Sequence, residues 1–178
     1  METLSEEWRE AVQERHLPQI ADRQRARRFA DPLLNEERTG GASSSYVAPT
    51  LSPDGEFVTF LSSGSYLRGE VFPDLWLGDA ETGKRIKRLV KTATNPDFEE
   101  LRLLYSQSSF SPDGRQLAFT AQKEGKDVLY LLDVRRRKVT KSFDKVNLDV
   151  VMSPSWSPDG KEIVFQGYNS GINDLYVI

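Results

Sequence analysis

The sequence predicts an all-β fold, a partial β-propeller of about three four-stranded blades behind a short N-terminal helical segment. Three observations support this prediction. A turn-forming tetrapeptide, Ser-Pro-Asp-Gly, occurs three times, and alternating apolar residues typical of a strand follow each copy. The copies begin 59 and 46 residues apart, which is close to the roughly 40 to 50 residues of one propeller blade.

Composition limits the class of protein. The 24 basic and 27 acidic residues leave a net charge of -3, which provides no overall field to attract nucleic acid or anionic lipid. The chain has no cysteine, so disulfides, thiolate metal sites and a cysteine nucleophile are excluded. No apolar run approaches the roughly 20 residues that a membrane-spanning helix needs, and no signal peptide pattern is present in this chain.

Residues 1–40 are predicted to form a helical lead-in and linker. Thr3 and Glu6 fit a capping box at the start of a helix over about residues 4–16, one face of which carries Trp8, Ala11, Val12 and Arg15. Pro18 ends this helix, and a second short one is expected over residues 22–29. Its basic residues are interpreted as a solvated helix face in preference to a phosphate-binding strip: Arg23, Arg25, Arg27 and Arg28.

The domain boundary is placed in the Gly-, Ala- and Ser-rich residues 40–45, so that residues 41–178 form the predicted propeller. Its blades are expected at about residues 45–92, 93–145 and 146–178. The third blade ends before its fourth strand, so we expect the chain to be an incomplete propeller, since propellers close with about 4 to 8 blades.

The repeated tetrapeptide has the chemistry of a tight turn. The copies are Ser52-Pro53-Asp54-Gly55, Ser111-Pro112-Asp113-Gly114 and Ser157-Pro158-Asp159-Gly160. Proline presets φ at the first corner, aspartate bonds to its own backbone, and glycine takes the position that requires a positive φ. We therefore predict positive φ at all three glycines. The three aspartates are interpreted as turn residues in preference to a carboxylate ring that binds a cation.

Strands are predicted on both sides of each turn. An apolar residue precedes each copy, and the next strand has apolar residues at alternate positions: Val58 and Phe60, Leu117 and Phe119, Ile163 and Phe165. A third strand follows, and its two apolar faces suit a strand that is packed between neighbouring blades: Leu75 to Leu77, Leu129 to Leu131, and Leu175 to Val177. We predict that these strand-two residues are largely buried, as are Trp76, Tyr130, Tyr176 and Trp156.

A turn at Gly83 is expected to lead into a fourth strand near Ile86 to Val90. In the second blade Arg135, Arg136 and Arg137 replace the glycine-containing turn, and Lys138 follows them. Their cluster of positive charge is interpreted as a solvated hairpin tip, in preference to a phosphate contact, and we predict that it is exposed.

The first blade has a longer hairpin loop, from Ser62 to Pro73. Loops on a rigid scaffold often carry function, so its larger side chains form a candidate contact loop: Tyr66, Leu67, Arg68 and Phe72. The favoured alternative is that these side chains pack against a neighbouring blade or the helical lead-in.

The repeated string of an apolar residue, Ser-Pro-Asp-Gly and a phenylalanine five residues later, followed by a strand that ends in Asp79 or Asp133, resembles the TolB-like, or PD40, β-propeller repeat, which is WD40-like. The resemblance covers about residues 46–178. Residues 8–20, 44–49 and 92–96 further resemble large bacterial proteins in which a peptidase-like domain precedes such a propeller and an outer-membrane barrel can follow. That resemblance implies a periplasmic or cell-envelope location.

Sequence motifs for catalysis are absent. The single histidine, His16, has no carboxylate or second histidine at ligand spacing, and neither a nucleophile elbow nor a phosphate-binding glycine loop occurs. We therefore expect no enzyme activity, no catalytic residues, no metal and no cofactor. The peptidase activity of the larger proteins is not carried over to this chain.

The function expected from these observations is that of a non-catalytic binding or scaffold module for protein–protein interaction. Its partners would be other proteins, or further blades and domains of a longer chain, with no nucleic acid and no insertion of this segment into a membrane. The alternative is the gating propeller of a prolyl-oligopeptidase-type serine peptidase whose catalytic domain lies outside this chain. A small-ligand module with a site in the central channel is a third possibility.

Overall fold

A computed structural model provides the structure of the chain. It describes residues 8, 11–12, 14–15, 30–34, 45–63, 73–94, 97, 100–101, 106–146 and 148–178. The chain divides into two units, Met1–Leu33 and Leu34–Ile178. In the first unit the described residues near the N-terminus are helical and exposed: Trp8, Ala11, Val12, Glu14 and Arg15. The other residues of the two predicted helices, including His16, lie outside the described part.

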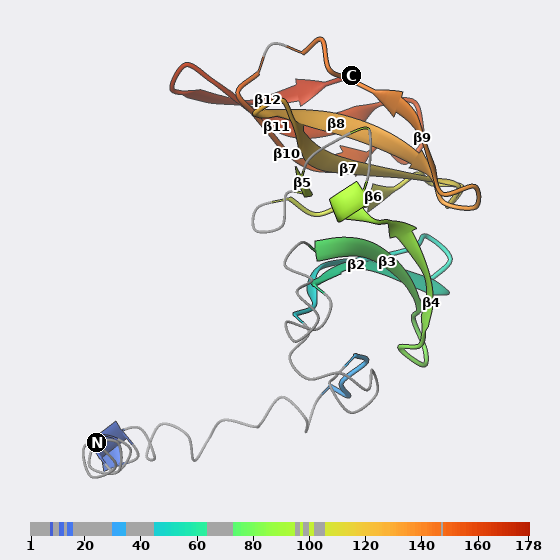
Figure 1. Ribbon diagram of the computed structural model, residues 1–178, viewed down its shortest axis with the longest axis vertical. Coiled ribbons are helices and arrows are strands. Elements are labelled where there is room, and N and C mark those ends of the chain that lie inside the picture. Colours follow the sequence, from blue (N-terminus) through green and yellow to red (C-terminus); the bar gives the residue numbers. More distant parts are fainter. Residues whose placement is uncertain are drawn as a thin grey trace. The chain divides into compact units, whose positions relative to one another are not determined.

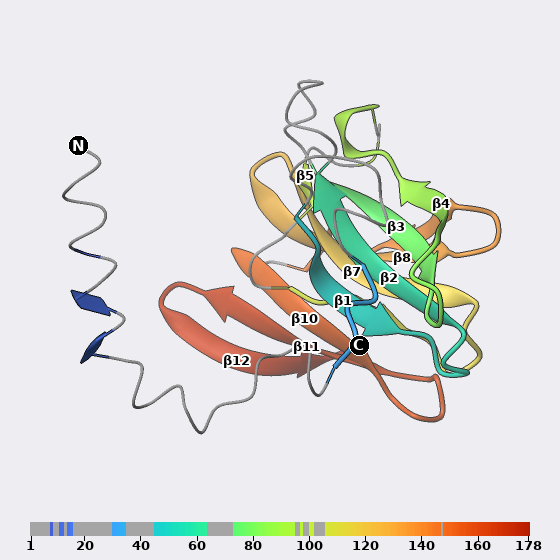
Figure 2. The same ribbon diagram turned by 90° about the horizontal axis from the view of Figure 1, so that it is seen from below.

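The second unit is built from three antiparallel sheets that follow one another along the chain, which we call blades 1, 2 and 3 (Figures 1 and 2). Blade 1 consists of β1 (Val47–Leu51), β2 (Phe57–Ser63), β3 (Pro73–Asp79) and β4 (Arg85–Val90), in that order. A short 3-10 helix, η3 (Thr92–Thr94), follows β4. The all-β class and the partial propeller are confirmed.

Blade 2 contains β7 (Gln116–Lys123), β8 (Lys126–Asp133) and β9 (Lys138–Ser142). Its first strand is divided into β5 (Glu100–Leu101) and β6 (Ser109–Phe110), which both pair with β7. Blade 3 has three strands in order: β10 (Val150–Trp156), β11 (Ile163–Asn169) and β12 (Ile172–Val177). Blade 2 packs against blade 1 in one apolar core and against blade 3 in another.

The Ser-Pro-Asp-Gly turns join the first two strands of each blade, as predicted. The three glycines have positive φ, 75° at Gly55, 69° at Gly114 and 71° at Gly160. In blades 2 and 3 the next hairpin turn needs only two residues between strands, whereas β2 and β3 of blade 1 are separated by residues 64–72. The longer separation between the second and third strands of the first blade is thus confirmed, although Ser62 and Pro73, which were predicted as loop residues, lie in β2 and β3. Its candidate contact residues, Tyr66, Leu67, Arg68 and Phe72, lie outside the described residues.

Two apolar cores hold the blades together. Leu75 and Leu77 of blade 1 pack with Leu117, Phe119 and Tyr130 of blade 2 in one core. The second core joins one face of blade 2 to blade 3, and its buried members are Ala118, Leu129, Leu131, Leu148, Val151, Ile163 and Phe165. Alternate residues of β7 and β8 therefore enter different cores, as the period of two in a strand requires.

All six alternating strand-two residues are buried, as predicted, and so is Tyr130. Its ring stacks on Phe119 with a centroid distance of 5.6 Å, and its hydroxyl donates to the carbonyl oxygen of Asp97 at 3.0 Å. Burial, together with the nearby carboxylates of Asp97 and Asp144, raises the pKa of Tyr130 to about 12. The phenol therefore stays protonated as part of the core.

Three other aromatic side chains are only partly buried, which is less than predicted. Trp76 contacts two guanidinium groups, since Cζ of Arg85 and Cζ of Arg88 are each 5.0 Å from its ring centroid. Tyr176 stacks on Phe165 from the last strand of blade 3. Trp156 packs beside the second core without being enclosed by it.

The prediction that the third strand is packed on both faces is wrong for blade 3. Leu129 in β8 is 1% exposed, whereas Leu175 at the equivalent position of β12 is 76% exposed. The reason is that blade 3 covers β8, while no described residue covers the corresponding face of β12.

Candidate functional site

An exposed apolar face on blade 3 is the first candidate site. In blade 2, Ala118, Leu129 and Leu131 form the face that contacts blade 3. The residues 46 positions later are Val164, Leu175 and Val177, and all three are exposed. The register confirms the equivalence, since Ala118 is opposite Leu131 in the β7–β8 pair and Val164 is opposite Val177 in the β11–β12 pair. Blade 3 thus presents to solvent the same surface that blade 2 buries.

More apolar side chains of blade 3 are exposed, of which Tyr168 shares the face of Val164 by strand alternation. They are Tyr168 in β11, Ile172 in β12 and Ile178 at the end of the chain. Among the described residues β12 pairs only with β11, so its other edge is unpaired. Exposed apolar surface next to an unpaired strand edge is typical of an interaction surface. Sequence analysis predicted Leu175 to Val177 as a strand packed on both faces, which is wrong for Leu175 and Val177. It did not single out Val164, Tyr168, Ile172 or Ile178.

The three Ser-Pro-Asp-Gly turns form a second, polar surface. In each turn the serine hydroxyl donates to the aspartate two residues later, and the backbone N–H five residues after the serine donates to that hydroxyl oxygen. The hydrogen bond from the serine is the main cause that lowers the pKa of the aspartate below its ordinary value, and a backbone N–H adds to it. Each aspartate therefore stabilises its own turn.

Successive turns contact one another across blades. A β-carbon placed at Gly114 would lie 3.9 Å from Cδ of Pro53. A β-carbon placed at Gly160 would lie 3.5 Å from Cδ of Pro112. Between the turns of blades 2 and 3 lies a cavity of about 240 Å³, lined by Ser111, Pro112, Asp113, Gln116, Trp156, Asp159 and Gly160. The indole Nε1 of Trp156 is buried and has no hydrogen-bond partner among the described residues.

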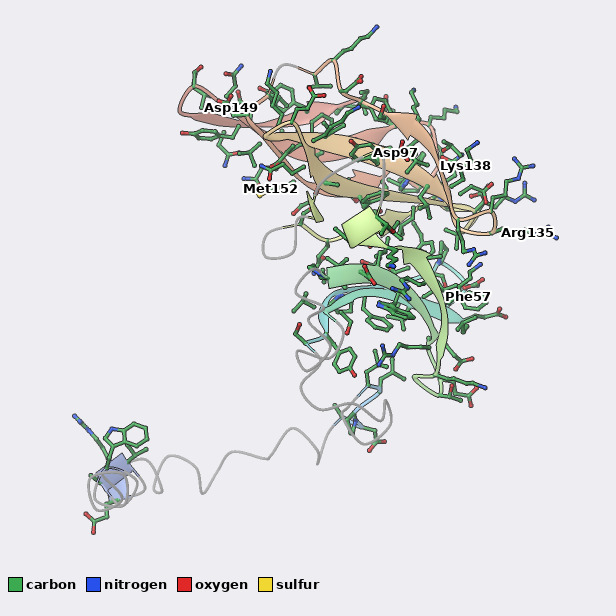
Figure 3. All side chains as sticks on the ribbon, in the orientation of Figure 1. Phe57, Asp97, Arg135, Lys138, Asp149 and Met152 are labelled. Carbon is green, nitrogen blue, oxygen red and sulfur yellow. The ribbon has the colours of Figure 1, made fainter. Side chains whose placement is uncertain are left out.

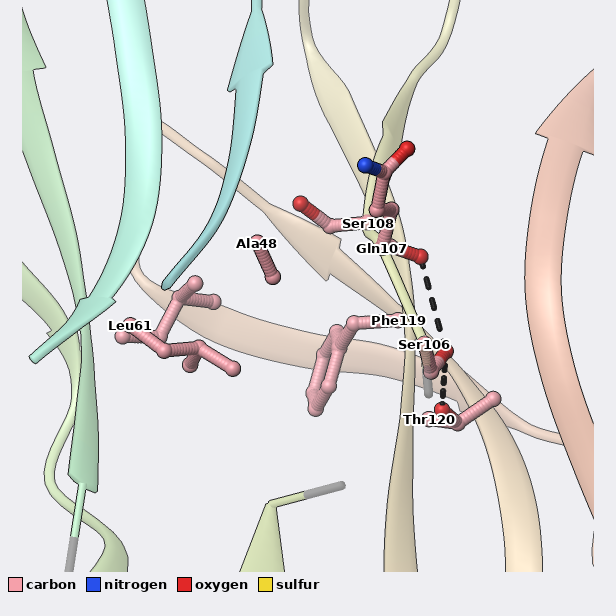
Figure 4. A pocket seen from close by; sticks show the side chains of 8 residues that line it. Ala48, Leu61, Ser106, Gln107, Ser108, Phe119 and Thr120 are labelled. Carbon is pink, nitrogen blue, oxygen red and sulfur yellow. Dashed lines mark hydrogen bonds between the residues drawn. The ribbon is translucent and has the colours of Figure 1, made fainter. Parts of the chain in front are cut away.

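A second cavity lies between blades 1 and 2, but it has a volume of only about 10 Å³ (Figure 4). Leu61 and Phe119 form part of its wall, and Thr120 donates to the hydroxyl of Ser106 at 2.6 Å. A space of this size holds at most about one water molecule, so it is not a ligand site.

The predicted basic tip lies in the turn between β8 and β9. Arg135 to Lys138 are all exposed, as predicted, and Figure 3 shows Arg135 and Lys138 at the end of this hairpin. Asp133 accepts the backbone N–H of Arg136 at 2.7 Å, as Asp79 accepts that of Thr82 in blade 1. The two hairpins are therefore equivalent.

The described residues contain no group of three or more His, Asp or Glu side chains that could hold a metal ion. Nor does the described part contain a helix long and apolar enough to cross a bilayer. The sites that remain are the apolar face of blade 3 and the turn surface.

Comparison with known proteins gives one family. The TolB β-propeller domain family, PD40, matches residues 34–178. No curated protein matches the sequence. Among solved structures, TolB from Acinetobacter baumannii aligns with a TM-score of 0.59 and 25% identity, over 75% of this chain and 29% of that one.

Two further structures support the fold alone. Hydrazine synthase from Kuenenia stuttgartiensis has a TM-score of 0.51 and 22% identity, over 73% of this chain and 31% of its own. A protein described as a TolB from Agrobacterium tumefaciens also has a TM-score of 0.51, with 23% identity, over 77% of this chain and 45% of its own. The chain thus spans less than half the length of each of these proteins.

Proposed function

The chain belongs to the TolB β-propeller domain family, PD40, and on this premise we propose that it is a non-catalytic module for protein–protein interaction. The exposed face of blade 3 is the observation that carries the proposal. Val164, Leu175 and Val177 are exposed, whereas a neighbouring sheet buries their equivalents in blade 2. Burying apolar surface is the main favourable contribution to most protein association.

The structure of the contact between blades 2 and 3 indicates what would cover this face. Ile163 and Phe165 of β11 project large apolar side chains from alternate positions onto blade 2. We therefore propose that another β-sheet with apolar residues at alternate positions packs on blade 3. This sheet would be a further propeller blade, supplied by a partner protein or by additional residues of a longer chain.

A cell-envelope location is part of this proposal, and the resemblance to the TolB family supports it. Neither the cavity between the turns nor the basic hairpin contains a nucleophile arranged with a base. The proposed function is therefore binding through surface residues, and not catalysis.

Photo-crosslinking in the cells that express the protein tests the proposal. Benzoylphenylalanine at position 175 should give a discrete adduct, because a covering sheet would lie within contact distance: either a crosslink to a partner protein, or an internal crosslink within a longer chain that peptide mass spectrometry identifies. The same group at Ile86, an exposed apolar position on β4 of blade 1, is the matched control and should give none. Absence of an adduct from position 175, or equal labelling from both positions, would contradict the proposal.

A further inference from the structure

The β8–β9 hairpin of blade 2 concentrates positive charge in a chain that has a net charge of -3. Four consecutive residues, Arg135 to Lys138, are exposed at its tip. Among the described residues, Asp133 is the acidic residue that forms an ion pair with this group. Its carboxylate lies 4.0 Å from Nε of Arg136, whose side chain is 81% exposed. Within the described part, the side chains of Arg135, Arg137 and Lys138 have no ion-pair partner. The hairpin therefore has several guanidinium and ammonium groups available to a ligand.

Two more cations border this hairpin. The carbonyl oxygen of Arg115 accepts the N–H of Val134 at 3.0 Å, and the side chain of Arg115 is 84% exposed. From blade 1, Lys87 reaches across to donate its Nζ to the carbonyl oxygen of Val134, also at 3.0 Å. Six cationic residues from two blades thus lie in or beside one turn, and two of them have a nearby carboxylate: Asp133 is 4.0 Å from Arg136, and Asp113 is 3.9 Å from Arg115.

The backbone gives an independent reason to assign a role to this arginine cluster. Arg137 has a φ of 56°, at the position where blade 1 has Gly83 with a φ of 70°. The hairpins match closely, since Arg137 N donates to the carbonyl oxygen of Asp133 as Gly83 N does to that of Asp79. Glycine would relieve the left-handed strain, so arginine is present at a conformational cost. Strain of this kind clusters at functional sites.

The neighbouring turns limit the shape of the ligand. The turns of blade 1 lie on the same end of the sheets, because Ala80 N bonds to the carbonyl oxygen of Glu56 and Gly114 lies near Pro53. They carry four carboxylates and one lysine: Asp54, Glu56, Asp79, Glu81 and Lys84. Asp159 and Glu162 lie on the other side, in blade 3, together with Lys161, which is 3.6 Å from the carboxylate of Asp159. A broad anionic surface such as a bilayer or a nucleic acid would meet these carboxylates, whereas a narrow chain would not.

From this charge pattern and the strained arginine, we propose that the hairpin Arg135 to Lys138, with Arg115 and Lys87, binds an acidic peptide segment of a partner protein. The planar guanidinium groups match carboxylates in bidentate geometry, which an exposed lysine does not offer. The site lies at the turn end of blade 2 and does not depend on the apolar face of blade 3. Either can therefore fail without the other.

Fluorescence anisotropy of a labelled oligoglutamate peptide with the full chain tests the site. The peptide should bind at low salt and be released as salt increases. The double variant Arg135→Gln and Arg136→Gln should weaken binding about tenfold, since each exposed ion pair contributes modestly. The matched control, Lys123→Gln and Lys126→Gln, removes the same charge at the opposite end of blade 2 and should change the Kd by less than about twofold.

Arg137→Gly separates ligand binding from folding. It should weaken the peptide complex while the melting temperature of the chain stays the same or increases, because it removes both a cation and a strained φ. Equal losses in the control and hairpin variants would overturn the proposal, as would absence of peptide binding. The same measurement is made with vesicles of phosphatidylglycerol and phosphatidylcholine and with a DNA duplex. If either of them binds more tightly than the peptide, and the hairpin variant loses that binding, the proposal is also overturned.

Discussion

Each Ser-Pro-Asp-Gly turn is stabilised by a hydrogen-bond network that is local in sequence. In blade 2 the hydroxyl of Ser111 donates to Asp113 at 2.6 Å and accepts the N–H of Gln116 at 2.9 Å. Asp113 also accepts the N–H of Arg115 at 3.0 Å. The serine thus connects the aspartate to the first residue of the next strand, which explains why the tetrapeptide begins with a hydroxyl residue.

These carboxylates make the stability of the fold dependent on acid. The pKa of Asp54, Asp113 and Asp159 is lowered in the folded state from the ordinary value of 3.8, mainly by the serine hydrogen bond. Their contribution is complete above that ordinary value and is lost as pH falls through the lower folded-state pKa. We expect the melting temperature to fall below about pH 4. Replacing all three by asparagine should flatten this part of the melting profile, and an unchanged profile would contradict the assignment.

Two substitutions at positive φ should have opposite effects. Gly114→Ala places a β-carbon at a φ of 69°, where Pro53 leaves room for it, so strain alone should cost about 1 kcal/mol. Arg137→Gly removes the same kind of strain and should stabilise by about 0.5 to 1 kcal/mol. Urea unfolding measures both changes. Effects of the same sign at the two positions would show that the turn geometry does not determine stability.

At the scale of one residue, the sequence predicted the turn glycines because proline, aspartate and glycine each constrain their own backbone. It did not predict the positive φ at Ala48 and Ser153, which bulge the first strands of blades 1 and 3. A signal was available, since proline follows both residues, at positions 49 and 154. Proline within a strand often marks a bulge.

The second and third strands of each blade carry the packing between blades. In blade 2, β7 and β8 are buried on both faces, so Leu117 and Phe119 contribute to one core while Ala118 and Leu129 contribute to the other. In blade 3 the equivalent strands are covered on one face only. The same pattern of apolar residues therefore gives a fully packed strand or an exposed one, depending on the neighbouring sheet.

Aromatic residues at equivalent strand positions should differ in their effect on stability. Phe119 is 4% exposed and stacked on Tyr130, so Phe119→Ala should lower the free energy of unfolding by about 3 to 5 kcal/mol. Trp76 is partly exposed and contacts two arginines, so Trp76→Ala should cost only about 1 to 2 kcal/mol. Denaturant melts of the two variants provide the comparison. A larger loss for Trp76→Ala would contradict the core assignment.

At the scale of an element, strand positions could be predicted because alternation and turns are local patterns. Burial was less predictable, because it depends on which sheet lies opposite. Three aromatic residues at apolar positions of the repeat are partly exposed. Trp76 contacts arginines, Tyr176 lies on the edge strand β12, and Trp156 lines the cavity between the turns of blades 2 and 3. The division of the first strand of blade 2 into β5 and β6 also had no signal in the repeat.

At the scale of the whole molecule, the three sheets form a series in which the apolar face of one sheet packs on the apolar face of the next. Blade 2 covers blade 1, and blade 3 covers blade 2. The series indicates that the exposed face of blade 3 is also a packing surface. The domain boundary near residue 40 and the role of residues 62–73 stay predictions.

The most direct test is light scattering combined with thermal melting of the 178-residue chain over a range of concentrations. The exposed apolar face should make the chain associate as concentration rises, and Leu175→Lys with Val177→Lys should prevent association without lowering the melting temperature, since both side chains are exposed. Ile86→Lys in blade 1 should leave association unchanged. A monodisperse, cooperatively melting monomer at every concentration, with no effect of the β12 variants, would contradict the account.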